Sequence, residues 1–111
     1  TSESFEFYFG HNKPADFMII AYYIKKKFIS LFPSAVNIDG SVRPQSVKKE
    51  TNPLFHSLIE EFGKLSGHPV LINTSFNVQG EPIVETPRDA LRCFGGTGID
   101  VLVIGNYILE K

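Results

Sequence analysis

The side chains best suited to chemistry in this 111-residue sequence lie together in residues 70–82. This stretch begins as an apolar run and then becomes rich in side chains that form hydrogen bonds: Asn73, Thr74, Ser75, Asn77 and Gln79. Hydroxyls and amides that follow a buried strand are suited to binding phosphate oxygens or a hydrated magnesium ion, because ligands of open α/β sheets bind at the carboxyl ends of strands. The alternative is a turn whose Ser, Thr and Asn side chains hydrogen-bond their own backbone.

The cation that would complete such a site is Arg43. It precedes Pro44, and a residue before proline favours extended backbone, so we expect Arg43 at a strand end or turn. The planar guanidinium binds phosphate through two parallel hydrogen bonds, whereas a surface ion pair with a carboxylate is the alternative role. We therefore predict a phosphate or nucleotide site in which Arg43 and residues 74–77 lie within one small-ligand diameter.

Other chemistries find little support in the sequence. Three scattered histidines and one cysteine show no metal-ligand spacing. The glycine-rich residues 95–98 follow an expected helix instead of a strand, so they indicate a helix end and not a phosphate loop. No histidine is placed by the sequence near Ser75 or Cys93, which leaves a nucleophile triad unsupported.

Composition bounds the class of protein. The net charge of −1 provides no electrostatic footprint for nucleic acid. A single cysteine, Cys93, fits a reducing compartment, and no apolar run approaches the length that spans a bilayer. We expect a cytoplasmic protein that binds neither nucleic acid nor membrane. Because the first residue is Thr1 and not methionine, we also expect a piece of a longer chain.

The elements that would position the polar residues follow from hydrophobic periodicity. We expect strands over residues 17–24, 35–38, 70–73 and 100–105 and a last strand after Asn106. The alternating aromatic residues 5–9 indicate a short strand or an edge segment that docks aromatic side chains on the core. Asn52 and Pro53 begin an amphipathic helix that ends at Gly67, and Thr86-Pro87 begin a second helix that stops at Gly95-Gly96. The predicted fold is α/β, one domain over residues 1–111, with a mixed twisted sheet and helices packed on it.

Several ordered segments of the sequence resemble the C-terminal region of the O-carbamoyltransferase family, which includes nodulation-factor and antibiotic-tailoring enzymes. The resemblance extends from Phe17 to Lys111 and is carried by residues 37–47, 52–55, 67–84, 86–91 and 98–104. Within it, residues 74–80 (Thr-Ser-Phe-Asn-Val-Gln-Gly) are similar to the Thr-Ser-Ala-Asn-x-Ser-Gly motif of YrdC-like domains. The expected fold is accordingly a partial YrdC-like domain.

The resemblance implies a biosynthetic enzyme that works in two stages. The YrdC-like domain joins carbamoyl phosphate with ATP to form a carbamoyladenylate, and an N-terminal domain of the same chain, with a metal ion such as iron, passes the carbamoyl group to a hydroxyl acceptor. By analogy, Asn73, Thr74, Ser75 and Asn77 contact the nucleotide, Ser75 and Asn77 hold its phosphates or their magnesium, and Arg43 holds phosphate. Such chemistry depends mostly on positioning and on neutralising charge.

Two departures from the family pattern shape the expectations. Asn37 stands where the family usually has histidine, and the family's Arg-rich segment is absent from these residues. We therefore expect the isolated chain to bind ATP weakly and to be inactive by itself. A threonylcarbamoyladenylate synthase of tRNA modification and a non-catalytic interaction module are the alternatives, and the near-neutral charge disfavours the former.

Overall fold

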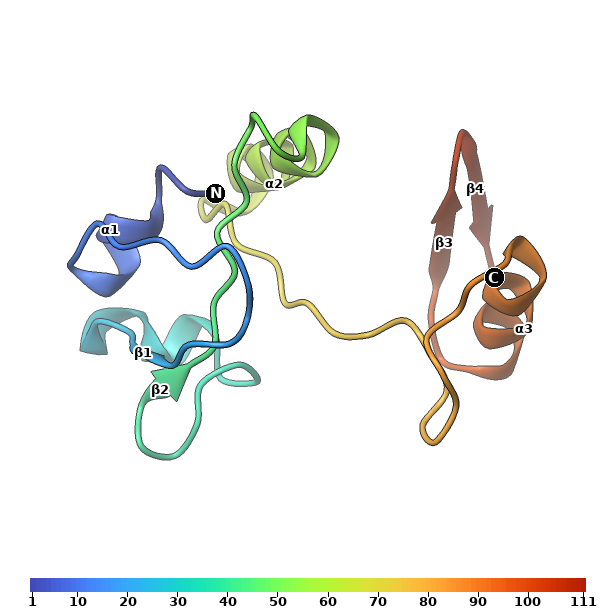
Figure 1. The fold of residues 1–111 in the computed structure, drawn as a ribbon, viewed down its shortest axis with the longest axis horizontal. Coiled ribbons are helices and arrows are strands. Elements are labelled where there is room, and N and C mark those ends of the chain that lie inside the picture. The colour runs from blue at the N-terminus through green and yellow to red at the C-terminus, as the bar shows by residue number, and fades with distance from the viewer. The chain divides into compact units, whose positions relative to one another are not determined.

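The computed structural model describes residues 1–111, and the chain divides into two compact units, Thr1–Ile72 and Asn73–Lys111 (Figure 1). We refer to them as the first unit and the second unit. The elements in chain order are the helix α1 (Phe5–Phe9), strand β1 (Tyr22–Tyr23), the 3₁₀ helix η1 (Lys26–Leu31), strand β2 (Ser41–Val42), the helices α2 (Pro53–Ser66) and α3 (Pro87–Gly96), and the strands β3 (Val101–Ile104) and β4 (Tyr107–Glu110).

The strands form two separate two-stranded antiparallel sheets, β1 with β2 and β3 with β4. The predicted mixture of helices and strands is confirmed, but the structure shows no mixed twisted sheet. A mixed sheet needs a hydrogen-bonding neighbour for every central strand, and the apolar runs expected to supply those strands adopt other conformations. Apolar character predicts burial of side chains and does not specify a backbone partner.

The aromatic residues 5–9 form the helix α1, so the prediction of a short strand there is wrong, whereas the alternative of a segment that docks aromatic side chains on the core agrees with the structure. Phe5 and Tyr8 lie one helical turn apart and are both buried, whereas Phe7 between them is 53% exposed. In a run this short, alternation and helical spacing fit the same residues. Burial of Phe5 and Tyr8 on the same side is what the helix achieves.

Two further strand predictions are wrong over most of their length. In residues 17–24 only Tyr22–Tyr23 is a strand, and Ile19 is 80% exposed. Residues 35–38 form a turn that leads into β2, where Asn37 N–H donates to the carbonyl of Ser41 at 2.8 Å. Only the two residues of residues 17–24 that lie opposite Ser41–Val42 have a neighbouring strand, and the rest of both apolar runs has none.

Residues 70–73, expected to form a central strand, have no regular secondary structure, and this prediction is also wrong. Val70 packs against the core of the first unit, while Ile72 is 63% exposed. The preceding Pro69 has no N–H to donate to a ladder. The apolar side chain of Val70 is therefore partly buried without the backbone pairing that defines a strand.

Aromatic side chains build the core of the first unit. Its buried cluster is Tyr8, Ile24, Phe28 and Val42, with the Tyr8 and Phe28 rings 4.9 Å apart between centroids. The Tyr8 hydroxyl lies 3.0 Å from His68 Nδ1, a contact between residues far apart in the chain. Burial raises the pKa of the Tyr8 hydroxyl, so this group acts as a neutral hydrogen-bonding partner.

The helix α2 confirms the predicted bounds. Asn52 Oδ1 accepts a hydrogen bond from Phe55 N–H at 3.2 Å, and Gly67 ends the helix in the left-handed conformation with φ +81°. After this end the chain passes close to Gly63, where a Cβ would meet Pro69 at 2.8 Å. Gly63 therefore permits the close return of the chain. No helix of the structure has the length and apolar character needed to cross a bilayer.

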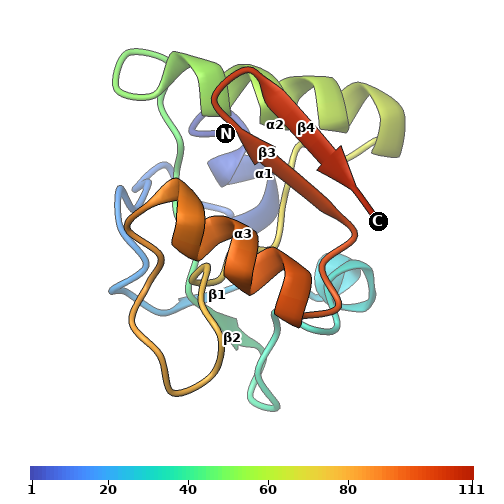
Figure 2. The ribbon, with the colours of Figure 1, turned by 90° about the vertical axis from the view of Figure 1, so that its right-hand side faces the viewer.

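In the second unit, α3 lies against one face of the β3–β4 hairpin (Figures 1 and 2). The buried residues at this contact are Ala90, Phe94 and Leu102. Leu102 pairs across the hairpin with Leu109, which also packs on this cluster. Both the helix after Thr86-Pro87 and the strand over residues 101–104 confirm the sequence prediction. The second unit is thus a helix on a hairpin with a small apolar core.

Candidate functional site

The polar stretch leads into a closed turn that its own hydrogen bonds organise. Val84 N–H donates to the Phe76 carbonyl at 3.0 Å and Glu81 N–H donates to the Val78 carbonyl at 2.9 Å. The Asn77 side-chain amide donates to the carbonyls of Val78 and Glu81, both at 3.0 Å. The amide nitrogen of Asn77 therefore braces the turn. For the Asn77 amide, the alternative of a turn whose side chains hydrogen-bond their own backbone is therefore the one that the structure shows.

Thr74 and Ser75 differ from Asn77. Both are exposed, and neither hydroxyl makes a hydrogen bond within the protein. They directly precede Phe76, whose carbonyl closes the turn and whose ring packs on the core of the second unit. The two hydroxyls thus follow one another on backbone that the turn anchors, next to the exposed Asn73. This arrangement leaves two adjacent hydroxyl groups available to oxygens of a ligand.

Arg43 lies directly after β2 and is exposed, and it takes part in no ion pair or hydrogen bond. The surface ion pair considered for Arg43 is therefore not formed. Both β2 residues before it, Ser41 and Val42, are buried, so the backbone that carries Arg43 is anchored while its side chain faces solvent. An unpaired guanidinium on anchored backbone can bind an anion without first losing a protein partner.

The turn before β2 accounts for Asn37. Its side-chain amide donates to Ser41 Oγ at 3.0 Å, and Asp39 Oδ1 accepts from Ser41 N–H at 2.9 Å. Hydrogen bonds from Ser41 lower the pKa of the exposed Asp39 carboxyl below its usual range. Asn37 therefore has a structural role in positioning the start of β2, two residues before Arg43.

The structure brings together only part of the predicted site. Residues 73–77 belong to the second unit, with the hydroxyls of Thr74 and Ser75 adjacent, whereas Arg43 belongs to the first unit. The short separation between Arg43 and these hydroxyls stays a prediction, as do magnesium binding by Ser75 and Asn77 and every nucleotide contact.

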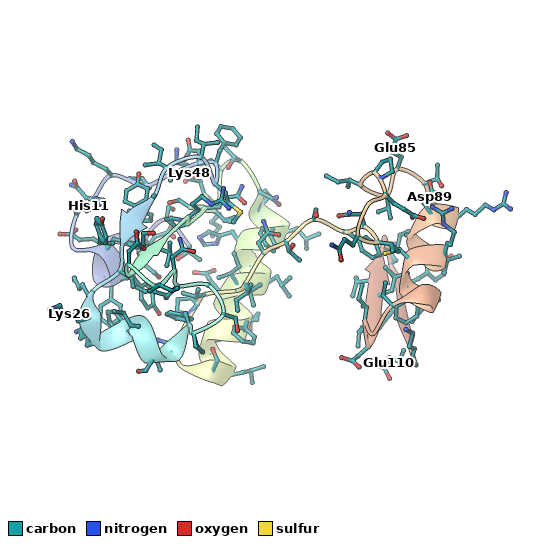
Figure 3. All side chains as sticks on the ribbon, turned by 90° about the horizontal axis from the view of Figure 1, so that it is seen from below. His11, Lys26, Lys48, Glu85, Asp89 and Glu110 are labelled. Carbon is teal, nitrogen blue, oxygen red and sulfur yellow. The ribbon has the colours of Figure 1, made fainter.

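The N-terminus of α3 is already occupied by a protein carboxylate. Thr86 and Asp89 form a capping box: Thr86 Oγ1 accepts from Asp89 N–H at 3.2 Å, and Asp89 Oδ2 accepts from Thr86 N–H at 3.2 Å. Figure 3 shows Asp89 on α3. These contacts lower the pKa of Asp89, the side-chain hydrogen bond from Thr86 most of all. The Thr-x-x-Asp spacing was the sequence signal for this box. A phosphate at this helix end would meet Asp89.

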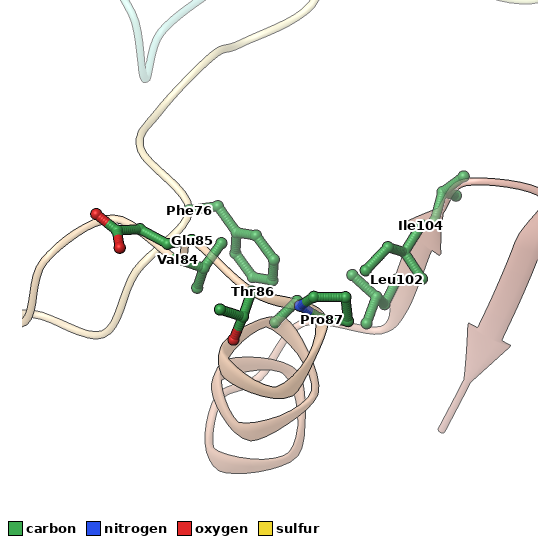
Figure 4. A pocket seen from close by; sticks show the side chains of 9 residues that line it. Phe76, Val84, Glu85, Thr86, Pro87, Leu102 and Ile104 are labelled. Atoms are coloured by element: carbon green, nitrogen blue, oxygen red, sulfur yellow. The ribbon is translucent and has the colours of Figure 1, made fainter.

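A pocket of about 270 Å³ lies beside β3 in the second unit. Its walls come from the turn after Phe76, the start of α3 and β3, and they include Phe76, Val84, Pro87, Ala90, Leu102 and Ile104. Figure 4 shows the ring of Phe76 on one side and Leu102 and Ile104 on the other, with the Glu85 carboxylate pointing away. Sequence reasoning missed this pocket, because its walls are residues separated along the chain.

The second feature that sequence reasoning missed is a buried histidine in the first unit. His56 is 2% exposed, and its Nε2 lies 3.0 Å from Glu3 Oε2. Its Nδ1 makes no hydrogen bond and lies 3.4 Å from Glu60 Oε2. The hydrogen bond with His56 is the main cause that lowers the pKa of Glu3 to about 2. This contact joins α2 to the segment before α1. Helical spacing gave no signal for it, because Glu3 lies far away in sequence.

Groups of three or more histidine, cysteine or carboxylate side chains that could hold a metal ion are not found. Cys93 is a buried free thiol on α3, and its backbone carbonyl accepts a hydrogen bond from Thr97 Oγ1 at 2.8 Å. The candidate chemistry of this chain therefore depends on Arg43 and on the hydroxyl and amide groups of residues 73–77.

Comparison with known proteins gives relatives in bacteria and archaea. The chain is 34% identical to nodulation protein NolO of Bradyrhizobium diazoefficiens over 99% of this chain and 20% of the relative. It is 32% identical to the 3'-hydroxymethylcephem-O-carbamoyltransferase of Amycolatopsis lactamdurans over 70% of this chain and 15% of the relative. An uncharacterized protein of Methanocaldococcus jannaschii is 42% identical over 85% of this chain and 15% of the relative.

The chain thus spans one fifth or less of the length of these relatives. The family described as Carbamoyltransferase C-terminus matches the chain over residues 1–111. The similarity covers both compact units, including Arg43 and the polar residues 73–77. From this match and from its relatives, the chain belongs to the carbamoyltransferase C-terminal family.

Proposed function

We propose that this chain contributes to carbamoyladenylate formation from carbamoyl phosphate and ATP in a full-length O-carbamoyltransferase. The observation that carries the proposal is the pair of exposed, unpartnered hydroxyls of Thr74 and Ser75 on an anchored turn. Hydroxyl groups in this arrangement donate hydrogen bonds to phosphate oxygens or ligate Mg²⁺. Relatives that are carbamoyltransferases by name support the reaction class.

Arg43 is the cation of the proposed site. Its guanidinium has no protein partner, so it is available to a phosphate group of ATP or of carbamoyl phosphate. The amide nitrogen of Asn77 is committed to the turn, which assigns Asn77 to positioning Ser75 and leaves its carbonyl oxygen as the group available for magnesium. In the proposed reaction water first cleaves carbamoyl phosphate to carbamate and phosphate. A carbamate oxygen then attacks the α-phosphorus of ATP, so that the adenylate forms and pyrophosphate leaves.

The remainder of the proposed enzyme supplies the transfer step. An N-terminal domain of the same full-length chain, with a metal ion such as iron, would accept the activated carbamoyl group and pass it to a hydroxyl acceptor. The YrdC-like relationship of the motif in residues 74–80 is part of this proposal. So is the expected location in the cytoplasm.

The test is pyrophosphate release by the full-length protein that contains this chain. With carbamoyl phosphate and ATP present, Ser75→Ala should lower the rate at least tenfold, because each charge-assisted hydrogen bond to phosphate contributes about 1.5–3 kcal/mol. Arg43→Ala should lower it by a similar factor. Ser34→Ala is the matched control, since Ser34 is also exposed but lies in a turn of the first unit.

Unchanged rates in both Ser75→Ala and Arg43→Ala would reject the site and leave the polar stretch as a turn. Calorimetry on residues 1–111 tests the other half of the proposal. With one cation and neutral hydroxyls, ATP should bind with a dissociation constant in the high-micromolar range or weaker. Tight binding would mean that the cations of the site have been misplaced.

A further inference from the structure

The β3–β4 hairpin carries apolar side chains on both of its faces, with Glu110 opposite Val101 at the end of one of them. Leu102 and its cross-strand partner Leu109 face α3, while Val103 and its partner Ile108 belong to the opposite face. On that opposite face Val101 is 47%, Val103 65% and Ile108 68% exposed. We call Val101, Val103 and Ile108 the outer face. Strands that are apolar on both sides are typical of sheets covered on both faces.

The outer edge of β3 is also unpaired, because the sheet consists of β3 and β4 alone. The pocket runs along β3, because it is lined by Leu102 and Ile104 from the face toward α3 and by Val103 from the outer face. An unpaired strand edge with an adjacent apolar pocket is the arrangement by which an extended segment adds to a sheet, with backbone hydrogen bonds to the edge and a side chain in the pocket.

The size of the second unit indicates that this surface is covered in the complete protein. It has about 40 residues, a size at which a single apolar core seldom suffices without a disulfide, a metal or a partner. Cys93 is a free thiol, and no group of metal ligands is present. A hairpin of two strands with one helix is marginal by itself. A second apolar layer on the outer face would bury more apolar surface and so stabilise the second unit.

We propose that the outer face of the β3–β4 hairpin and its adjoining pocket bind the part of the full-length carbamoyltransferase that precedes this region. Four fifths or more of each relative lies outside the matched segment, and the matched family is a C-terminal one, so the preceding chain is the largest body available to cover it. The occupant is an extended apolar segment of that preceding chain. This inference concerns assembly and does not depend on the proposed adenylate chemistry.

The test is photo-crosslinking in the full-length protein. The photoreactive residue p-benzoylphenylalanine replaces Val103 on the outer face, or Arg88 on α3 as an exposed control within the same unit. After irradiation, mass spectrometry identifies the joined peptides. We expect at position 103 at least a tenfold excess over position 88 of crosslinks to residues that precede Thr1 in the full-length chain.

Crosslinks from position 103 that stay within residues 1–111, that join two copies of the protein, or that do not exceed the control would each overturn the proposal. Hydrogen exchange of the unsubstituted full-length protein tests the same proposal without any substitution that could disturb folding. If a segment pairs with the edge of β3, the β3 amides should exchange at least tenfold more slowly than those of an unprotected strand edge. Alternate β3 amides that exchange at the unprotected rate would also overturn the proposal.

Discussion

The two compact units are held together by different kinds of contact. In the first unit, side chains far apart in the sequence meet: Tyr8 with His68, Glu3 with His56, and Ala15 with Ser46 through reciprocal hydrogen bonds. In the second unit the contacts are local, with a capping box at the start of α3 and a hairpin that joins adjacent strands. Stability in the first unit therefore depends on long-range polar contacts, and in the second on local order.

This difference explains where the sequence was informative. Caps and hairpins are encoded within a few residues, so the second unit could be read from its pattern. The first unit depends on which distant side chains meet, and four short apolar or aromatic runs in or bordering it were misread as strands or as longer strands. Four predictions test whether the comparison between the units is correct.

The largest effect is expected for Phe94→Ala in the second unit. Phe94 is 7% exposed and is the largest side chain of the small core with Ala90 and Leu102. Truncation of a buried phenylalanine costs about 3–5 kcal/mol, which should open the second unit while the first unit stays protected. Hydrogen exchange of the full-length protein measures both units. Leu91→Ala, at a 48% exposed position of the same helix, is the control and should change little.

Loss of protection in both units after Phe94→Ala would contradict the comparison, because it would mean that the two units fold as one cooperative body. Equal effects of Phe94→Ala and Leu91→Ala would instead mean that the described core does not hold α3 on the hairpin.

The next effect is expected for Tyr8→Phe in the first unit. The substitution keeps the buried ring and removes the hydroxyl that pairs with His68 Nδ1. Leaving a fully buried polar partner unsatisfied costs about 1–3 kcal/mol, and because His68 is only half-buried we expect about 1–1.5 kcal/mol, the lower part of this range. Exchange should increase around α1 and near His68 and remain unchanged in the second unit. Tyr23→Phe, at a position that is 71% exposed, is the control. A null result for Tyr8→Phe would remove this long-range contact from the comparison.

A smaller, local effect is expected for Thr86→Ala. It removes one side of the capping box and should destabilise the first turn of α3 by about 1 kcal/mol. Thr86→Ser retains the hydroxyl and should behave as the unsubstituted protein. Amide exchange of residues 88–90 provides the measurement. If both substitutions had the same effect, the methyl group and not the hydrogen bond would be responsible.

The smallest effect concerns acid. The folded-state pKa of Glu3 is lowered from its ordinary 4.5 to about 2, chiefly by the hydrogen bond with His56. The contribution of this carboxylate to stability is therefore fully present above pH 4.5 and is lost as the pH falls toward 2. Because Glu3 is largely exposed, we expect less than about 1 kcal/mol. An NMR titration of the Glu3 carboxyl should give a midpoint below 4.5, and an unshifted midpoint would mean that the contact with His56 is absent in solution.

The sequence indicated the residue types of the candidate site and not their arrangement. The hydroxyls of Thr74 and Ser75 are exposed and make no hydrogen bond within the protein, and their contact with a ligand stays a prediction. Asn77 was expected to contact the nucleotide. Its amide nitrogen instead donates to the carbonyls of Val78 and Glu81 within the turn, so only its side-chain oxygen is left for a ligand. Nothing in the pattern distinguished these roles. A hydroxyl and an amide are both hydrogen-bonding groups, and only the backbone path around them decides which carbonyls come within reach.

The sequence by itself determined the family, the bounds of α2 and α3, and a strand on each side of Asn106. The signals are local: Asn52 with Pro53, Thr86 with Pro87, and the apolar runs on either side of Asn106 act within one or two turns of chain. Only the tertiary structure decided that residues 5–9 are helical, that residues 70–73 remain unpaired, and that His56 is buried against Glu3. Each of these depends on a partner distant along the chain, and the choice among distant partners follows from packing of the whole and not from local propensity.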